Sequence, residues 1–430
     1  MLTIEINNSY SKISGLSTLQ EKELKELLSY DVGTQAAFYA GGHRPRRKSL
    51  LGRRGEFPTG LLPRVNAAFP RSSLRDLRHV PVPIGRTPNV YPFEPYQAQV
   101  DAAQAAADKH RGCISMPTGT GKSLVIAMIA DKLDVKTLVI VPSVEIKKQL
   151  KASIDTLCVG HNVTVENIDS KALQTAKDYD CLIIDEAHHV AAKTYQKLNK
   201  TAWVDIYYRF FLTATPFRNN TEETLLFEAL AGQVIYALSY KDAVKAGYIV
   251  PVEAYYIETP NITTDAYTWS QVYSQLVVSN QTKNEAIAST LVRLNAVGAS
   301  TLCLVKEVAH GDKLSAMTGL NFANGKDNDT RQFIEQFNAG KIKSLIGTTG
   351  ILGEGVDTKP CEYVIIAALG KAKSAFLQQV GRAVRTYPGK ESAKVIIIKD
   401  KSHKFTLRHF NEQKKILKDY YGIVPEKLDI

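Results

Sequence analysis

Short apolar runs rich in β-branched residues recur along the chain from about residue 110 onward, and longer segments with helical periodicity separate them. Runs without polar alternation are typical of strands covered on both faces, and therefore of parallel sheets. We expect these strands in two blocks, first over 137–142, 163–167, 181–187 and 209–216, then over 301–306, 344–349, 362–369 and 394–400. Strand–helix alternation in two blocks predicts two α/β units in tandem.

Two of the intervening helices can be placed from local signals. One is expected over "SVEIKKQLKASIDTL", and another over "DTRQFIEQFNAGK", which would begin at a capping Asp329 and end near Gly340. The first 90 residues differ, because a strand ("LTIEI") and a helix ("STLQEKELKELLSY") precede a basic stretch punctuated by Gly and Pro. We therefore expect domains over 1–88, 89–235 and 236–430, with segment 231–251 joining the last two and 80–90 as an extended linker.

Charge and composition then narrow the class of protein. The net charge is +11, which favours an acidic partner such as nucleic acid, although many soluble proteins are mildly basic without one. Between residues 41 and 90 there are eleven Lys or Arg residues against two acids, an excess that either contacts a phosphate backbone or is a solvated basic loop. Five scattered cysteines without a CxxC pair do not support a zinc or iron–sulfur site. The N-terminus lacks a signal peptide and no apolar run is long enough to span a membrane, so we expect a cytoplasmic protein.

The stretch "SMPTGTGKSLVIAMIADKL" matches the phosphate-loop pattern GxxxxGK[ST], except that Met116 replaces the first glycine. Gly119 and Gly121 would let the loop curl so that its backbone N–H groups point inward. Lys122 would meet the β- and γ-phosphates, and the Ser123 hydroxyl would bind Mg²⁺. The alternative is a flexible Gly/Thr turn. A strand before the loop, a helix after it and a carboxylate downstream all favour the phosphate loop over that alternative.

That carboxylate lies in "CLIIDEAHH", where an apolar strand runs into Asp185 and Glu186. Two unpaired acids buried at a strand end would cost several kcal/mol, and a metal ion would offset that cost. Asp185 is then a Mg²⁺ ligand, direct or through water, and Glu186 is placed to deprotonate the attacking water. His188 and His189 have no metal-ligand spacing with any cysteine and would contact another motif or solvent.

The stretch "QQVGRAVR" places Arg382 and Arg385 three residues apart, so that on a helix they would share one face. By itself this basic patch could meet DNA, an acidic neighbour or water. The aromatic residues Tyr267, Trp269 and Tyr273 leave a similar choice, because their near-helical spacing fits a core as well as base stacking.

The ordered set "MPTGTGKS", "DEAH", "LTATP", "IGTTGILGEGVD" and "QQVGRAVR" resembles the motif set of superfamily 2 helicases and translocases, over roughly residues 90–400. Upstream, "FEPYQAQ" resembles the adenine-reading motif of the DNA-remodelling branch, and "VIVPSVEIKKQL" its strand-contacting motif. The chain looks most similar to the UvsW-like recombination helicases of tailed bacteriophages. That resemblance implies an α/β fold with two tandem RecA-like parallel-sheet domains, preceded by a small N-terminal α+β accessory domain that binds DNA.

The resemblance also implies residue roles. Gln97 would bind the adenine of ATP beside Phe93 or Tyr96, and Gly355 and Asp357 would meet the ribose side. The phosphates would lie against Pro117, Thr118, Gly119, Thr120, Gly121, Lys122 and Ser123, with Mg²⁺ at Ser123 and Asp185. Glu186, Gln378, Arg382 and Arg385 would carry catalysis. Pro142, Ser143, Thr348, Thr349 and Gly350 would hold the DNA backbone, although strand-end capping is the alternative for the threonines.

We therefore expect an ATP-dependent DNA helicase or translocase that remodels forked or branched DNA, in the host cytoplasm if the chain is viral. No wedge or hairpin insertion is recognisable, so translocation is a safer expectation than strand separation. The first alternative is a DEAH-type RNA helicase, against which the Tyr–Gln motif argues. The second is a non-motor P-loop NTPase, which would not explain the second α/β block. The sequence names no protein partner.

Overall fold

The computed structural model describes residues 2–32, 46–158, 160, 162–175, 178–216, 221–325, 329–352, 358, 360–368, 370 and 372–428. The chain divides into two compact units, which are described separately below. The first unit comprises residues 1–116 and 121–237, and the second comprises 117–120 and 238–430. No helix in the described part of the chain is long and apolar enough to cross a membrane.

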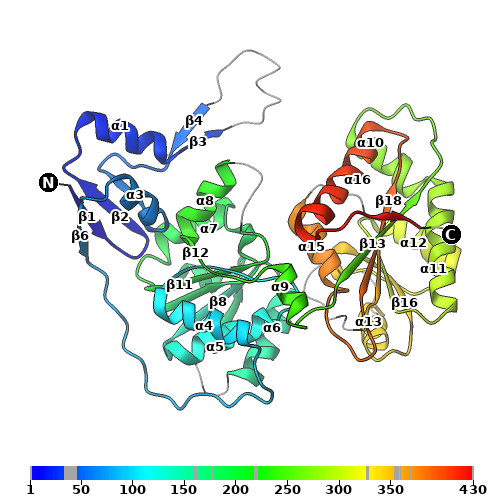
Figure 1. Cartoon of the computed structure of the whole chain (residues 1–430), viewed down its shortest axis with the longest axis horizontal. Helices are drawn as coiled ribbons and strands as arrows, with labels where there is room; N and C mark the ends of the chain where they lie inside the picture. The colour runs from blue at the N-terminus through cyan, green and yellow to red at the C-terminus, as the bar shows by residue number, and fades with distance from the viewer. Residues whose placement is uncertain are drawn as a thin grey trace. The chain divides into compact units, whose positions relative to one another are not determined.

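A six-stranded parallel sheet organises the first unit, with strand order β12-β7-β11-β10-β8-β9. Figure 1 labels three of its strands, β8, β11 and β12. Its strands are β7 (Arg111–Ser115), β8 (Thr137–Val141), β9 (Val163–Asn167), β10 (Cys181–Ile184), β11 (Tyr208–Thr213) and β12 (Val234–Ala237). Its helices are α4 (Gln97–Lys109), α5 (Lys122–Leu133), α6 (Val144–Leu157), α7 (Lys193–Thr201) and α8 (Thr221–Ala231). The strands expected in the first block are all present and all pair in parallel, which confirms that part of the prediction.

The apolar runs form parallel strands because both faces of the sheet are covered. Every residue of β8, β10 and β11 is buried, so a polar position on either face would have no access to water. The helix expected after β8 is α6, and Ser143 caps it by accepting a hydrogen bond from the Ile146 N–H at 3.3 Å.

A seven-stranded parallel sheet organises the second unit, in the order β15-β16-β14-β17-β18-β13-β19. Its strands are β13 (Val252–Glu258), β14 (Thr301–Val305), β15 (Phe322–Ala323), β16 (Ser344–Thr348), β17 (Tyr363–Ile366), β18 (Ala393–Lys399) and β19 (Glu426–Lys427). Its α-helices are α9 (Tyr240–Lys245), α10 (Trp269–Tyr273), α11 (Gln281–Ala296), α12 (Val308–Thr318), α13 (Thr330–Asn338), α14 (Thr349–Leu352), α15 (Lys373–Gly381) and α16 (Lys404–Ile416). Short π-helical segments, Ser274–Val278 and Leu417–Tyr421, follow α10 and α16.

Alternate residues of this second sheet lie in separate cores. Leu302, Leu304 and Val364 pack with Phe376 and Phe410, residues of α15 and α16, on one face. Cys303, Val305 and Ile365 pack with Ile287 and Leu314, residues of α11 and α12, on the other. Each sheet is thus covered by helices on both faces, which confirms two α/β units in tandem.

One local prediction for this unit was wrong. Asp329 occupies the position before α13, but its side chain makes no capping hydrogen bond. The backbone of Asp329 is already helical (φ −77°, ψ −11°), whereas a capping side chain needs an extended backbone to reach back to the first free N–H groups.

Residues 2–76, which we call the N-terminal module, carry a four-stranded mixed sheet of order β5-β2-β1-β6. Its elements are β1 (Thr3–Ile6), β2 (Tyr10–Ser14), α1 (Thr18–Leu27), β3 (Ser29–Val32), β4 (Arg46–Ser49), β5 (Glu56–Pro58), α3 (Leu62–Ala68) and β6 (Ser73–Asp76). β3 and β4 form a separate antiparallel pair. The expectation of a small α+β region at the N-terminus is confirmed.

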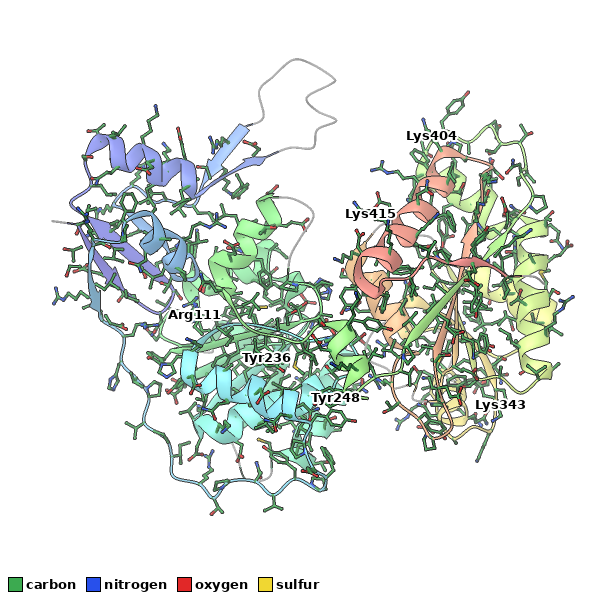
Figure 2. All side chains as sticks on the ribbon, in the orientation of Figure 1. Arg111, Tyr236, Tyr248, Lys343, Lys404 and Lys415 are labelled. Atoms are coloured by element: carbon green, nitrogen blue, oxygen red, sulfur yellow. The ribbon has the colours of Figure 1, made fainter. Side chains whose placement is uncertain are left out.

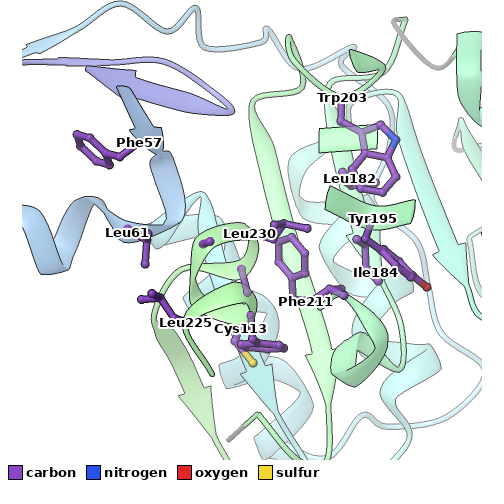
Figure 3. Close-up of a cluster of buried hydrophobic side chains, with 14 of the residues drawn as sticks. Phe57, Leu61, Cys113, Leu182, Ile184, Tyr195, Trp203, Phe211, Leu225 and Leu230 are labelled. Atoms are coloured by element: carbon purple, nitrogen blue, oxygen red, sulfur yellow. The ribbon is translucent and has the colours of Figure 1, made fainter. Parts of the chain in front are cut away.

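The N-terminal module shares a hydrophobic core with the six-stranded sheet. Phe57 and Leu61 of the module belong to the same buried cluster as Cys113, Leu225 and Leu230 (Figure 3). The backbones approach closely at Gly60, where a Cβ atom would lie 2.2 Å from the carbonyl oxygen of Glu228. The module therefore packs as part of the first unit.

A buried arginine also holds this interface. The guanidinium of Arg209, on β11, donates to the Ser9 hydroxyl at 2.7 Å and to the Asn199 side-chain oxygen at 2.6 Å. It also donates to the Ile206 carbonyl at 2.9 Å and to the Trp203 carbonyl. Ser9 lies between β1 and β2 of the module, so Arg209 joins both sides of the interface through hydrogen bonds that no solvent reaches.

From the module, the chain runs in an extended segment without helix or strand before α4. Two acids near the end of α5 hold this segment. The side chain of Asp134 accepts hydrogen bonds from the backbone N–H groups of Gly85 and Arg86, and Asp131 accepts one from Asn89. The expected linker over 80–90 is thus an extended strap bound to the surface of the first unit.

Candidate functional site

A tight loop connects β7 to α5 at the carboxyl end of the sheet. Gly119 (φ 86°) and Gly121 (φ 77°) have left-handed backbones, and the Thr120 hydroxyl donates to the Pro117 carbonyl at 2.8 Å. Met116 is buried, its φ is not positive, and its N–H donates to the Thr213 carbonyl at 3.1 Å. A glycine is therefore not required at position 116, which explains how this sequence departs from the usual pattern and keeps the loop.

Helix α5 begins at Lys122, with Gly121 as its N-cap residue. The first N–H groups of a helix have no intrahelical acceptor, and the positive end of the helix dipole adds to their attraction for an anion. Lys122 and Ser123 are half-buried at this end, so an ammonium and a hydroxyl stand beside those N–H groups. The arrangement is suited to binding phosphate.

A glutamine that the sequence analysis did not single out packs against this loop. A Cβ atom added at Gly121 would lie 2.4 Å from Nε2 of Gln99, so the side chain of Gln99 touches the loop directly. Gln99 is buried and its Oε1 accepts a hydrogen bond from the Tyr96 N–H at 2.9 Å. Gln97 instead is exposed and donates to Asp101 at 2.7 Å. Its adenine-binding role stays a prediction, as does stacking by Phe93 and Tyr96, which are both exposed.

Asp185 and Glu186 follow β10 at the same carboxyl edge of the sheet. The Asp185 carboxylate accepts a hydrogen bond from the Glu186 N–H at 2.9 Å, and Glu186 has a left-handed backbone (φ 47°). Nδ1 of His188 lies 3.3 Å from Oε2 of Glu186, close enough for an imidazole N–H to donate to that carboxylate. His188 is buried, so it orients Glu186, a role that the sequence left unassigned.

Burial and the neighbouring Glu186 raise the pKa of Asp185 to about 6, while Lys122 opposes that shift. The two carboxylates repel each other in a poorly solvated place, and the single lysine compensates only in part. Carboxylate and hydroxyl oxygens are the ligands that Mg²⁺ prefers, so Asp185 and Ser123 fit a magnesium ion. Among the described residues there is no cluster of three or more His, Cys, Asp or Glu side chains that would suit a metal held by protein ligands alone.

Asp185→Asn is expected to stabilise the metal-free protein at pH 8 by about 3 kcal/mol, because the folded pKa lies about two units above the value of 3.8 for a solvated aspartate. A carboxyl whose folded pKa is raised destabilises the fold as it ionises. The cost therefore appears as pH rises from about 4 to 6, and the difference between variant and parent should vanish near pH 4. Thermal unfolding in EDTA across this range measures it.

Asp155→Asn, at an exposed carboxylate paired with Lys151, is the matched control and should change little at either pH. If Asp185→Asn and the parent were equally stable at pH 8, ionised Asp185 would not destabilise the metal-free fold, and the prediction would be wrong.

Other expected contacts also lie at carboxyl edges. Thr213 and Thr215 belong to the motif "LTATP"; Thr213 ends β11, Thr215 follows it, and both are buried, with the Thr215 N–H donating to the Thr213 hydroxyl at 3.1 Å. Pro142 and Ser143 follow β8 in the first unit, where the Ser143 hydroxyl already caps α6. In the second unit Thr348 ends β16, and Thr349 and Gly350 open α14. Ligands of parallel α/β sheets bind at this edge, so a DNA-holding role stays a prediction consistent with the fold.

The expected helical face of arginines is wrong. Helix α15 ends at Gly381 and Arg382 is its C-cap residue, while Arg385 lies beyond the helix in an isolated bridge with Ile249. The backbone leaves the helix because the Val384 carbonyl accepts a hydrogen bond from the Val250 N–H at 2.9 Å. Gln378 and Arg382 are buried, and burial lowers the pKa of Arg385. Gly355 and Asp357 lie outside the described residues.

Two protein families match the chain. The family described as "Type III restriction enzyme, res subunit" matches residues 91–175 and 155–218, and the family described as "Helicase conserved C-terminal domain" matches residues 276–387. The first match spans the phosphate loop and Asp185–Glu186, and the second spans Thr348, Gln378 and both arginines.

Several curated relatives are helicases or translocases. Putative helicase 22 of a Sulfolobus islandicus filamentous virus is 24% identical over 73% of this chain and 65% of its own length. DNA 3'-5' translocase XPB2 of Sulfurisphaera tokodaii is 22% identical over 67% of this chain and 77% of its length. ATP-dependent DNA helicase uvsW of Enterobacteria phage T4 is 19% identical over 70% of this chain and 68% of its length. The chain thus spans about two thirds to three quarters of these relatives.

The fold is also found in solved structures. A fragment of a putative HsdR subunit of a type I restriction enzyme from Vibrio vulnificus superposes with a TM-score of 0.59 at 19% identity, covering 79% of this chain and 69% of the fragment. S. cerevisiae Dbp5 superposes with a TM-score of 0.56 at 15% identity, over 78% of this chain and 90% of Dbp5. At such identities these structures support the two-sheet fold alone. With both family matches placed on the two sheets and the motifs in order along them, the chain belongs to the superfamily 2 helicases.

Proposed function

We propose that the protein is an ATP-dependent DNA translocase or helicase that remodels forked or branched DNA. The observation that carries the proposal is the arrangement of Lys122, Asp185 and Glu186 in the first unit. An ammonium at a helix N-terminus lies near two adjacent carboxylates, and its charge opposes the rise in the pKa of Asp185. That set provides a phosphate site, a cation ligand and a base, as ATP hydrolysis requires.

Within this site each side chain has a distinct task. The N–H groups at the start of α5 and the Lys122 ammonium bind the phosphates, and Thr120 keeps the loop closed through its bond to Pro117. Glu186, held by His188, accepts the proton of the attacking water. Mg²⁺ held by Ser123 and Asp185 would neutralise charge on the β- and γ-phosphates. Arg382 and Arg385 belong to the second unit, and we assign them to the charge that develops on the transferred phosphoryl group.

DNA as partner is supported by charge. The net charge is +11, and four exposed basic residues of the N-terminal module gather around β4 and the following turn, namely Arg47, Lys48, Arg53 and Arg54. Such side chains bind phosphates irrespective of sequence. The alternative partner is RNA, and substrate-dependent stimulation of hydrolysis separates the two.

The test is ATP hydrolysis by the full chain alone and with single-stranded, duplex, forked or four-way DNA, or with RNA. Lys122→Ala gives the background rate of contaminating enzymes. We expect the largest stimulation by forked or four-way DNA. Greater stimulation by RNA would assign the protein to RNA, and no stimulation by any nucleic acid would overturn the motor proposal while leaving an ATPase.

Arg53→Gln combined with Arg54→Gln is expected to weaken binding of forked DNA and to lower the slope of log affinity against log salt by about 1.8, or about 0.9 for each lost phosphate contact. The basal ATPase should not change. Point variants are preferable to removing residues 1–85, because that deletion would expose the core shared by Leu61 and Leu225. Salt titration by fluorescence anisotropy measures the slope. If the slope of log affinity against log salt did not change, Arg53 and Arg54 would be solvated residues that do not contact DNA.

A further inference from the structure

The three aromatic residues singled out in the sequence have different environments. Trp269 packs against α16, with its ring 4.2 Å from the His409 ring and 6.1 Å from the Phe405 ring, and Tyr273 is buried against Trp269. Tyr267 lies two residues earlier, before α10, and its side chain is 86% exposed. Core packing thus explains two of these residues and leaves Tyr267 presented to solvent near the first turns of α16.

Helix α16 and the π-helical turn after it carry a row of basic residues on one face. Lys404, Arg408, Lys415 and Lys418 are all exposed, and Asn411 completes the row. Their spacings of four, seven and three residues keep them within one stripe of a helix with 3.6 residues per turn. The row is about 21 Å long at 1.5 Å per residue. Figure 2 labels Lys404 and Lys415 toward opposite ends of this row.

The stripe has an excess of positive charge and a hollow surface. Residues 404–419 contain five Lys or Arg residues and two acids, Glu412 and Asp419. Within the described part of the chain, none of the four stripe cations forms an ion pair with a carboxylate. A hollow of about 350 Å³ lies along the stripe, lined by Lys404, Leu407, Arg408, Asn411, Glu412 and Lys415.

The stripe starts at the edge of the sheet where a DNA track is expected. Lys404 follows β18 by a few residues and Tyr267 follows β13, so both are on the carboxyl side of the same parallel sheet as Thr348 at the end of β16. In the strand order, β16 and β18 are separated by β14 and β17. Three strand spacings of about 4.8 Å place the two strand ends roughly 14 Å apart. A short stretch of nucleic acid can span that distance.

We propose that the α16 stripe, with Tyr267 at its start, binds the backbone of single-stranded DNA and leads a strand away from the carboxyl edge of the second sheet. The cations contact phosphates, Asn411 supplies a neutral donor within the row, and Tyr267 stacks on an unpaired base. A paired base has both faces covered by its neighbours, so an exposed ring beside a basic row favours a single strand over a duplex. This binding requires no ATP hydrolysis and is therefore separable from the proposed motor function.

Binding of a labelled, unstructured single-stranded DNA oligonucleotide to the full chain without nucleotide is the test. Arg408→Gln combined with Lys415→Gln should weaken this binding about tenfold and lower the slope of log affinity against log salt by about 1.4, or about 0.7 for each lost contact. Tyr267→Ala should weaken it about tenfold without changing the slope, because stacking releases no counterions. Binding of a duplex of equal length should change much less in all variants.

Lys341→Gln combined with Lys343→Gln is the matched control. Both lysines are exposed in the same unit, but they precede β16 at the amino edge of the sheet, and Figure 2 shows Lys343 far from α16. If the two double variants weakened single-stranded DNA binding equally, the stripe would contribute only through the overall positive charge of the protein, and the proposal would be overturned. Equal loss of duplex binding would reject the single-strand assignment. In either case DNA-stimulated ATP hydrolysis by the unmodified chain still decides the motor function by itself.

Discussion

Arg385→Ala is expected to lower DNA-stimulated ATP hydrolysis about 10³- to 10⁵-fold, while ATP binding stays nearly unchanged. In phosphoryl transfer, negative charge spreads over the equatorial oxygens of the transferred group, and a guanidinium that meets it stabilises the transition state more than the ground state. Arg385 lies beyond the end of α15, tied by its backbone to Ile249, and burial lowers its pKa without removing its charge at neutral pH. A poorly solvated guanidinium interacts more strongly with an anion than an exposed one.

Turnover rates and ATP binding, the latter from a fluorescent nucleotide analogue, separate the two effects. Arg331→Ala removes the same charge from an exposed site on the same unit, where the side chain is 90% exposed and pairs with Glu335, so it should leave both quantities unchanged. Arg385→Lys keeps the charge but loses the planar fork, and should recover only part of the rate. If binding and turnover fell together with a lower melting temperature, Arg385 would be a structural residue. The same comparison on Arg382→Ala decides which arginine dominates.

Asp400→Asn is expected to lower the stability of the second unit by about 3–5 kcal/mol, because it leaves a buried ammonium without its carboxylate. Lys283 and Asp400 are both fully buried, and Nζ of Lys283 lies 3.4 Å from Oδ2 of Asp400. Desolvation already lowers the pKa of Lys283, and the carboxylate opposes that shift. Asp400 also accepts a hydrogen bond from the Ser402 N–H at 2.8 Å, so the pair joins α11 to the segment that leads into α16.

A double-mutant cycle sharpens this prediction. Lys283→Met alone should be about as costly as Asp400→Asn, while the double variant should recover much of the loss because no uncompensated charge remains. Glu335→Gln breaks the exposed pair with Arg331, 2.9 Å apart, and should cost less than about 1 kcal/mol. Urea unfolding followed by Trp269 fluorescence reports the second unit, with Trp203→Phe in every protein to remove the other tryptophan. Single variants no more costly than Glu335→Gln would exclude a stabilising pair.

Many of the strands and the nucleotide-binding loop could be predicted from adjacent residues in the sequence. The runs that became β8, β10 and β16 are mainly apolar and lack polar alternation, and every residue in them is buried, a pattern that indicates cover on both faces and parallel pairing. The phosphate loop and the Asp185–Glu186 pair are contiguous, so their chemistry depends on a few backbone angles that glycine and strand ends supply. The alternation of such strands with helical segments in two blocks was sufficient to predict two tandem sheet units.

Contacts between residues far apart in sequence decided the rest. Gln97 and Gln99 are the same residue type two positions apart, so the sequence does not distinguish them. The packing of α4 places Gln99 against Gly121 and leaves Gln97 exposed to solvent. The arginine spacing suggested a helix, yet a hydrogen bond from Val250 draws the backbone out of α15. The sequence predicts the N-terminal module as a domain of its own. In the structure the guanidinium of Arg209, some 200 residues later, donates a hydrogen bond to the Ser9 hydroxyl of the module. Sequence therefore determined which groups bind phosphate and which runs form sheets, since both follow from adjacent residues. Burial and orientation depend on distant neighbours, and only the tertiary structure fixed them.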